Sequence, residues 1–382
     1  MAKSTKVLAI FLTLLVLAVG SYFGYRKYSS ISRPKESQPV EIPFSILNNK
    51  FGFLSGGPES YGFIKSVGGS WLRPHPGPFL WDAMQNKNGG TINFATSDKI
   101  VKEAQKNDLA ILATLWPFAE WDQRMGSNTQ SCAVPDQDEF LAKNDKKGHG
   151  DYLPVHRCAP VNWEEYQSWV KQTVERYDGD GTNDMPDLEL PIKYWEVMNE
   201  PDLPANPDGR LVFWRDTPDN YGKLLIKTYQ AIKEADSGAS VVIAGAAGGG
   251  EQFLNFYRQV FKNPQTLESF DIANIHCISN DSYENFNVEP YKKMLEEFRI
   301  KKPVWVTEAE IIISDNASIN ATQTWKSSQK ALDLGAEKIF FTRYEFTANK
   351  DVPKLEKKAA VGAEINGDNP IDAYKRITGT NL

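Results

Sequence analysis

Short apolar runs alternate with longer amphipathic segments along most of this sequence, and no other feature limits the fold so strongly. Most of the runs have the length of a strand and are rich in β-branched or aromatic residues, which is typical of strands buried on both faces. The clearest run is Leu109–Trp116, and the shortest is Trp71–Arg73. The other six are Phe51–Leu54, Lys193–Glu200, Ser240–Gly245, Ile272–Ile278, Pro303–Glu308 and Lys338–Tyr344.

The segments between these runs carry apolar residues at helical spacing, and Ser97 is a residue type that commonly caps a helix. The predicted helices are Ser97–Asn107, Asn162–Tyr177, Thr217–Ala235, Tyr291–Phe298, Ala321–Leu334 and Asp372–Ile377. Strands that alternate with helices form parallel βαβ units, and eight such units predict an α/β fold of the (β/α)8 TIM-barrel type.

A doubly wound open sheet is the structural alternative. Such a sheet normally shows a glycine-rich phosphate turn after an early strand. The glycine-rich stretch here, Gly245–Gly250, follows the fifth run and lacks the G-x-G-x-x-G spacing. We interpret it as a tight loop at the mouth of the barrel.

The N-terminal segment predicts a membrane anchor. Lys3 and Lys6 precede an uncharged run, Val7–Tyr25, which is long enough for a helix to cross about 30 Å of hydrocarbon. We favour an uncleaved signal-anchor, and cleavage as a signal peptide near Gly20 stays open. The predicted organisation is an anchor or signal peptide over residues 1–28, a linker over 29–43 and one barrel domain over 44–382.

Either alternative at the N-terminus implies export and, if the segment is retained, attachment to a membrane. Cys132 and Cys158 lie in one long polar segment, where an oxidising compartment would let them pair, and the sequence leaves this open. Cys277 is expected to be a buried apolar residue. The net charge of −6 and the lack of a long basic run argue against a nucleic-acid partner.

Two glutamates follow apolar runs at positions where a barrel carries its chemistry. Catalytic groups of barrels stand at the carboxyl ends of strands. Glu200 ends the fourth run and Glu308 the seventh. Alternation along each strand predicts that Tyr194, Glu196, Met198 and Glu200 share one face, and that Val304, Val306 and Glu308 share another. The two carboxyls should therefore face each other across the mouth.

Glycoside hydrolysis uses such a pair. One carboxyl protonates the leaving oxygen while the other meets the oxocarbenium-like carbon, and a separation of about 5–5.5 Å favours retention of configuration. We expect Glu200 to be the acid/base and Glu308 the nucleophile. Glu310 is a weaker candidate for the nucleophile, because it is expected in the loop beyond the strand.

The segments Tyr194–Pro201 (YWEVMNEP) and Pro303–Glu308 (PVWVTE) resemble the two signatures of glycoside hydrolase clan A, especially families 39 and 5. The resemblance implies a retaining β-glycosidase barrel with Glu200 as acid/base and Glu308 as nucleophile. It also implies that Asn199 holds a sugar hydroxyl and that Arg73 supports the nucleophile. His276 matches a histidine on the sixth strand of that clan.

Departures from the clan pattern concern the substrate more than the mechanism. The clan often shows His-x-Tyr on strand six, whereas this chain has His276-Cys277-Ile278, so Tyr283 in the next loop is a candidate replacement. Tyr344 ends the eighth run, and family 5 usually places a tryptophan after that strand. Further substrate-binding candidates are His75 and Trp116, with Trp116 either a sugar platform or a plug of the mouth.

Two acidic features have structural explanations beside functional ones. Glu196 lies lower in its strand than Glu200, so we expect a buried ion pair with Arg73 or Arg343. A loop of acidic residues resembles a calcium loop, although Asn183 stands where a glycine is expected. The alternatives for this loop are a solvated acidic turn and a structural calcium site formed by Asp178, Asp180, Asp184 and Glu189.

The function predicted from the sequence is a metal-free, cofactor-free glycosidase that acts on β-linked oligo- or polysaccharides. The alternative is a catalytically silent barrel that binds glycans at the cell surface. Metal-dependent hydrolysis is disfavoured, because four histidines without an H-E-x-x-H motif leave few ligand sets.

Overall fold

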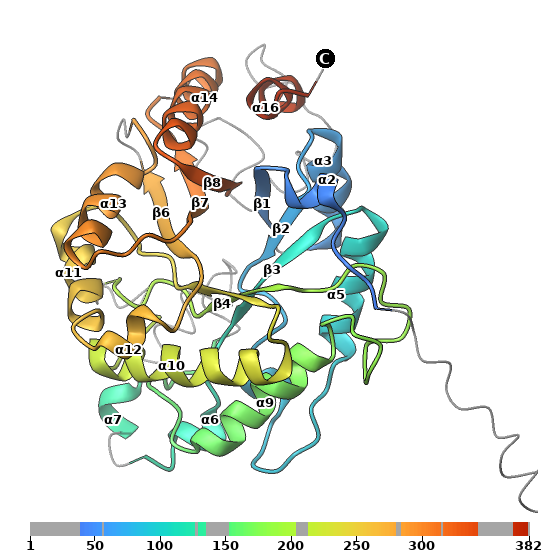
Figure 1. The fold of residues 1–382 in the computed structure, drawn as a ribbon, viewed down its shortest axis with the longest axis vertical. Helices are drawn as coiled ribbons and strands as arrows, with labels where there is room; N and C mark the ends of the chain where they lie inside the picture. The colour runs from blue at the N-terminus through green and yellow to red at the C-terminus, as the bar shows by residue number, and fades with distance from the viewer. Residues whose placement is uncertain are drawn as a thin grey trace, which may run out of the picture. The chain divides into compact units, whose positions relative to one another are not determined.

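The computed structural model of the protein describes residues 39–55, 57–126, 129–134, 153–203, 213–279, 284–314, 316–342 and 370–380. Eight strands form one parallel sheet in the order β5-β4-β3-β2-β1-β8-β7-β6. The ends of this sheet meet through parallel bridges at Val242–Ile272 and Ala246–Ile275, which nearly close it into a barrel. Figure 1 shows the labelled strands at the centre and the helices around them. The predicted (β/α)8 TIM-barrel fold is confirmed.

All eight predicted strands form, with boundaries that differ by a few residues. Strands β3, β4 and β5 are shorter than the apolar runs that predicted them, whereas β1, β2, β6 and β7 extend past the ends of theirs and β8 begins before its run. The strands are β1 (Phe51–Ser55), β2 (Trp71–Pro74), β3 (Ala110–Leu115), β4 (Tyr194–Val197), β5 (Ser240–Ile243), β6 (Ala273–Ser279), β7 (Val304–Ile311) and β8 (Ala336–Phe341).

The six predicted helices also form, and shorter ones join them. Asn162 and Thr217 cap their helices, because each side chain accepts a bond from a backbone N–H of the first turn. The expected cap at Ser97 is wrong: that helix begins two residues earlier, and Ser97 is buried inside it. The helices that correspond to the predictions are α5 (Ala95–Lys106), α9 (Trp163–Glu175), α10 (Pro218–Ala235), α13 (Val288–Glu297), α14 (Ala317–Asp333) and α16 (Pro370–Thr378).

Most of the remaining helical segments are too short to show the helical period, whereas α11 (Glu251–Val260) has a buried apolar face at helical spacing that the sequence prediction missed. They are α2 (Phe44–Leu47), η1 (Pro58–Ser60), α3 (Tyr61–Ser66), α4 (Trp81–Met84), α6 (Glu120–Gln123), α7 (Thr129–Cys132), α11 (Glu251–Val260) and α12 (Pro264–Leu267). Cys132 at the end of α7 forms a disulfide with Cys158, and Cys277 is free and buried.

Strand residues alternate between two apolar clusters. The larger cluster lies between the sheet and the helices and includes Leu72, Trp195 and Val306. The smaller one fills the barrel at the amino ends of the strands and includes Trp71 and Trp305. Further along each strand, the inward positions change from apolar to polar residues, and these polar positions hold the candidate site.

The short helix α2 closes the amino end of the barrel. Ile42 and Ile46 join the inner cluster. The indole N–H of Trp71 donates to the carbonyl of Ile46 at 3.0 Å. The ammonium of Lys338 donates to the carbonyls of Leu47 and Asn49 at 2.7 and 2.8 Å. Packing and hydrogen bonds thus hold α2, the plug helix, at the end of the barrel opposite the candidate site.

The chain divides into two units of very different size. The large unit contains Val40–Gly179 and Asn183–Leu382, and the small one groups Asp180–Thr182 with the N-terminal segment. The run Val7–Tyr25 lies outside the described residues, so the anchor and the domain boundaries stay predictions. Among the residues that the structure describes, no helix has both the length and the apolar character needed to span a membrane.

Candidate functional site

Glu200 lies beyond strand β4 rather than at its end. The strand stops at Val197, and the backbone of Met198 and of Glu200 is left-handed, with φ of 71° and 41°. Residues other than glycine rarely adopt this conformation, and such strain is found at functional sites. Alternation therefore holds only as far as Glu196. The predicted common face is wrong for Met198, which packs in the outer cluster, whereas the Glu200 carboxyl does reach the interior beside His276. A turn of the backbone places the Glu200 carboxyl.

Glu308 lies inside strand β7, where the expected alternation also fails. Val304 and Val306 pack in the outer cluster, whereas Trp305 packs inside the barrel. Glu308 nevertheless points into the barrel, because its carboxylate contacts the fully buried guanidinium of Arg73 at 2.8 Å. The prediction that Val304, Val306 and Glu308 share a face is therefore wrong.

A bulge in β7 explains this change of face. Ile275 of β6 pairs with Val306, but the next residue, His276, pairs with Glu308, so Thr307 is extra. An extra residue in a strand redirects the side chains that follow it. Thr307 and Glu308 consequently both face the interior, although they are consecutive.

Three buried side chains meet at the carboxyl ends of β4, β6 and β7. Glu200, His276 and Glu308 each have an oxygen or ring nitrogen within 4.8 Å of the others. All three are less than 9% exposed. His276 Nδ1 lies 2.7 Å from Glu200 Oε1 and 3.7 Å from Glu308 Oε1. Two residues far apart in sequence thus bring their carboxyls to the distance at which both can reach one anomeric carbon.

Arg73 of β2 links Glu308 to two further polar side chains, Glu196 and Asn199. Its Nε donates to Glu196 Oε2 at 2.8 Å, its Nη1 to Glu308 Oε1 at 2.8 Å and its Nη2 to Asn199 Oδ1 at 2.6 Å. The predicted ion pair of Glu196 with Arg73 is confirmed, and Arg343 lies outside the described residues. The guanidinium holds Glu308 in place and turns the Asn199 amide.

His276 bridges Glu200 and the bulge residue. Its Nε2 lies 2.8 Å from Thr307 Oγ1. Gly245, just after β5, makes room for the ring, because a Cβ at that position would overlap the imidazole. The start of the glycine-rich loop therefore serves close packing beside the site, which the sequence had indicated only as a tight turn.

Burial separates the charge states of these groups. It raises the pKa of Glu200 to about 7, with Arg73 lowering it and Glu196 raising it. It also raises the pKa of Glu308, against the lowering effects of His276 and Arg73. Burial lowers the pKa of His276 to about 4, so the ring is neutral at pH 7. One carboxyl that keeps its proton near neutral pH, beside another paired with a cation, suits general acid and nucleophile chemistry.

Several site residues were missed by sequence reasoning. Asn274 and Thr114 occupy inward positions of their strands, a signal that strict alternation could have supplied. Thr307 could not be found, because the bulge changes its face. Asp202 is buried near Glu200, where its Oδ2 accepts from the Ala247 N–H at 2.9 Å and its Oδ1 has no hydrogen-bond partner among the residues that the structure describes. Burial raises the pKa of Asp202 well above its ordinary value.

The predicted aromatic and histidine contacts divide into three groups. His75 is half-buried, and its Nδ1 lies 3.5 Å from Arg73 Nη1. Trp116 is fully buried, its indole N–H donates to the carbonyl of Pro76, and its ring lies beside His75 and Phe213. Tyr283 and Tyr344 lie outside the described residues, so their roles stay predictions.

Glu310 is in strand β7 and not in the following loop, which corrects the expectation from the sequence. The strand is longer than the apolar run that predicted it. Glu310 lies two residues beyond Glu308, and its Oε2 accepts from the Thr342 hydroxyl at 2.7 Å. Glu310 is therefore a neighbour of Glu308 on the same strand.

The donor atoms of Glu200, His276 and Glu308 are close enough together to surround a cation. Both ring nitrogens of His276, however, are engaged with Glu200 and Thr307, and Glu308 already faces Arg73. A metal ion would have to displace these contacts, so the set fits acid/base chemistry better than metal binding.

The calcium prediction concerns a different loop. Asp178 is buried, and Asp184 accepts a hydrogen bond from the backbone N–H of Gly179 at 3.1 Å. Glu189, the last proposed ligand, is exposed. Asp180 belongs to the smaller unit of the chain. Calcium binding here therefore stays a prediction.

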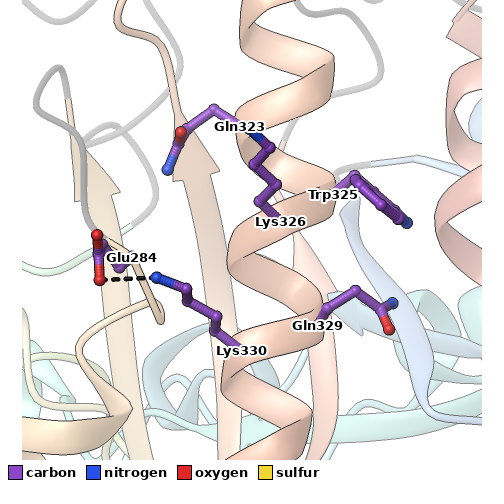
Figure 2. A pocket seen from close by; sticks show the side chains of 6 residues that line it. All are labelled: Glu284, Gln323, Trp325, Lys326, Gln329 and Lys330. Atoms are coloured by element: carbon purple, nitrogen blue, oxygen red, sulfur yellow. Dashed lines mark hydrogen bonds and ion pairs between the residues drawn. The ribbon is translucent and has the colours of Figure 1, made fainter.

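A hollow of about 410 Å³ lies on α14, away from the carboxyl pair. Figure 2 shows its lining, with an ion pair between Lys330 and Glu284 on one side of the helix and Trp325 on the other. None of the side chains that meet around Arg73 lines this hollow, and it takes no part in the argument for chemistry.

Comparison with known proteins supports the fold. No protein family model and no curated protein matches the chain. Among solved structures, a glucosidase from Croceicoccus marinus is 14% identical with a TM-score of 0.57, over 90% of this chain and 69% of that one. Xylanase 10B from Thermotoga maritima is 16% identical with a TM-score of 0.53, over 89% of this chain and 98% of that one.

A family 39 glycoside hydrolase from Bacteroides cellulosilyticus WH2 is also similar, at 15% identity and a TM-score of 0.50. The match covers 80% of this chain and 58% of that one, so this chain spans less than two thirds of that protein. At such low identities the likeness extends to the barrel, and the argument for function depends on the carboxyl pair.

Proposed function

We propose that this protein is a retaining glycoside hydrolase that cleaves β-linked oligo- or polysaccharides. The observation that carries the proposal is the pair of buried carboxyls, Glu200 and Glu308, with an oxygen of each within 4.8 Å of the other. A short separation leaves room for direct attack on the sugar but none for an intervening water, which favours double displacement. The glycoside hydrolases with similar structures support the same reaction class.

In the first step, Glu200 gives its proton to the glycosidic oxygen as the bond to the anomeric carbon breaks. The Glu308 carboxylate forms a covalent ester with that carbon, and the alcohol leaves. Esterification removes the charge of Glu308, so the pKa of Glu200 falls and its carboxylate can accept a proton from water. The resulting hydroxide equivalent attacks the anomeric carbon, which releases the sugar and restores both carboxyls.

Hydrolysis of aryl β-glycosides by the wild type and by single variants tests the proposal. Glu308→Gln should abolish turnover of every substrate. Glu200→Gln should lose roughly 10²- to 10⁴-fold with a poor leaving group, and much less in the first step with an activated one that needs no protonation. Glu310→Gln is the matched control on β7 and should keep most of the activity.

Equal rates in the wild type, Glu200→Gln and Glu308→Gln, or no turnover of any glycoside, would favour the catalytically silent glycan-binding barrel. A loss in Glu310→Gln that matches the loss expected of Glu308→Gln would assign the nucleophile to Glu310. The anomeric configuration of the first product, followed by NMR, distinguishes retention from inversion.

We also propose that the chain is exported and tethered to a membrane by the run Val7–Tyr25, with residues 29–43 as linker. The hydrophobic length of the run supports this proposal. Cell fractionation of the full chain and of a chain that lacks residues 1–28 tests it, since only the full chain should sediment with membranes. A soluble full chain of reduced mass would indicate a cleaved signal peptide.

A further inference from the structure

A chain of four hydrogen bonds runs through the barrel from the candidate acid/base to a buried carboxylate below it. Glu200 Oε1 lies 2.7 Å from His276 Nδ1, and His276 Nε2 lies 2.8 Å from Thr307 Oγ1. The Thr307 hydroxyl lies 2.8 Å from Asn274 Oδ1, and the Asn274 amide donates to Glu196 Oε1 at 2.7 Å. Glu200 is 8% exposed and the other four residues are fully buried, so the chain is shielded from exchange with solvent.

The far end of the chain determines its direction. A carboxylate only accepts hydrogen bonds, so Asn274 must turn its NH₂ group toward Glu196 and its oxygen toward Thr307. The single hydroxyl proton of Thr307 then points away from His276, toward Asn274 Oδ1 at 2.8 Å, with Glu196 Oε1 as a second acceptor at 3.5 Å. Thr307 Oγ1 is left to accept from His276 Nε2–H. A neutral imidazole with its hydrogen on Nε2 has a bare Nδ1. The proton between Nδ1 and Glu200 must therefore come from Glu200.

We propose that Glu196 is a positioning residue that fixes the tautomer of His276 and thereby keeps the proton on Glu200. The inference rests on the proposed function, which gives that proton its use in protonating the leaving group. It extends that function by assigning the charge state of the acid/base to a residue that touches no substrate.

The surroundings of Glu196 keep it an acceptor. Its second oxygen, Oε2, accepts from Arg73 Nε at 2.8 Å and from the Thr114 hydroxyl. The side chains of Arg73 and Glu196 are both fully buried, so the cation and the carboxylate compensate each other away from water. With donors on both oxygens, Glu196 has no acceptor nearby to which it would give a proton.

The charges around Glu200 also favour its protonated form. Arg73 forms ion pairs with Glu196 and Glu308 but not with Glu200, so ionised Glu200 would add a further uncompensated negative charge. The titratable and charged groups that act on Glu200 from the elements packed around it are Arg73, Glu196, Asp202, Tyr257, His276 and Glu308. Only Arg73 is a cation at neutral pH, and burial raises the pKa of Glu200 to about 7.

Nitrogen-15 NMR of the full chain labelled at histidine tests the direction of the chain. The chain has four histidines, so a variant that lacks His276 identifies its signals. The chemical shifts of the two ring nitrogens report which one carries the hydrogen. The expected result at pH 6 is a hydrogen on Nε2 and a bare Nδ1. A hydrogen on Nδ1 in the wild type would overturn the proposal.

Thr307→Val removes the acceptor of the Nε2 hydrogen while leaving every charge in place. The hydrogen should then move to Nδ1, where it can donate to a Glu200 carboxylate, and the titration midpoint of Glu200 should fall by on the order of one pH unit. Thr114→Val is the matched control, because it makes the same change on the other oxygen of Glu196, outside the chain. It should leave the His276 signals unchanged.

Glu196→Gln removes the obligatory acceptor and should also move the hydrogen of His276 to Nδ1, while Glu196→Asp retains a carboxylate and should keep the wild-type tautomer. If the glutamine variant does not fold, Glu196→Ala leaves room for water beside Arg73 and has the same expected result. An unchanged tautomer in either Thr307→Val or the neutral Glu196 variant would refute the role of Glu196.

The midpoint of Glu200 is followed by carbon-13 NMR of labelled glutamate carboxyls, with Glu200→Gln identifying the signal. Neither NMR measurement requires turnover, so the proposed function and the proposed role of Glu196 can be refuted independently of each other. A protein that hydrolyses no glycoside but shows the expected tautomers would refute only the proposed function. An active enzyme whose His276 signals ignore Thr307→Val would refute only the inference.

Discussion

Individual side chains at the mouth of this barrel owe their properties to burial as much as to identity. Glu200 and Glu308 are the same residue type, yet only Glu308 forms an ion pair with Arg73, while Glu200 faces a neutral histidine. Desolvation disfavours the charged form of a carboxyl, and a nearby guanidinium favours it. Their environments therefore differ in the way that the proposed acid and the proposed nucleophile require.

The difference predicts the pH dependence of glycosidase activity. As the pH rises through the pKa of Glu200, about 7, the proposed acid loses its proton, so kcat/KM should fall above neutral pH. The acid limb reflects the ionisation of Glu308 and should lie above the ordinary range of a glutamate, because burial raises its pKa. A pH profile with an activated aryl glycoside is the control, since its first step should lack the basic limb. A limb that persists there would argue against Glu200 as the acid.

At the scale of elements, the site depends on two places where regular structure is interrupted. The left-handed turn after β4 places Glu200, and the bulge in β7 turns both Thr307 and Glu308 inward. Gly245, just after β5, also matters for the site, because it has no side chain at the place where the ring of His276 packs. Loops at the carboxyl ends of barrel strands can vary in this way without loss of the barrel.

Replacement of Gly245 by alanine tests this packing. The new Cβ would overlap the Nε2 side of the His276 ring, so the ring must move and its hydrogen bonds with Glu200 and Thr307 would be disturbed. We expect a loss of about 1–3 kcal/mol in the free energy of unfolding and on the order of 100-fold in kcat/KM. Urea denaturation and steady-state kinetics measure the two effects. Gly62→Ala in α3 is the control, because a Cβ there meets no atom within 4 Å. It should leave kcat/KM unchanged and raise the free energy of unfolding by up to about 1 kcal/mol, since alanine favours a helix over glycine.

The whole molecule separates stability from chemistry along the axis of the barrel. Apolar side chains and the plug helix α2 fill the amino ends of the strands, whereas ionisable and amide side chains occupy the carboxyl ends. The sheet closes on itself, because β1 pairs with β8 and isolated bridges join β5 to β6. The polar side chains therefore lie in one common interior, to which they extend from β2, β3, β4, β6 and β7. A charged interior is tolerated because its members pair with one another.

Ile46→Ala should therefore affect stability alone. The buried side chain packs in the inner cluster, and its truncation should lower the free energy of unfolding by about 2–4 kcal/mol. Phe44→Ala, in the same short helix but 77% exposed, should change it by less than about 0.5 kcal/mol. Both variants should keep the wild-type pH profile and KM. A shift of the profile in Ile46→Ala would show that the two ends of the barrel are coupled.

The sequence by itself determined the eight alternating units, the six longer helices and the candidate residues Glu196, Glu200 and Glu308, because periodicity and strand ends are local properties of a chain. The resemblance to glycoside hydrolase clan A added Arg73 and His276 as candidates. The sequence did not determine which face each residue takes near the site. The turn at Met198, the bulge at Thr307 and the room left by Gly245 arise only when neighbouring strands pair and side chains compete for the same interior. Tertiary structure therefore decided the partners and the charge states, since burial and contact with distant residues set both.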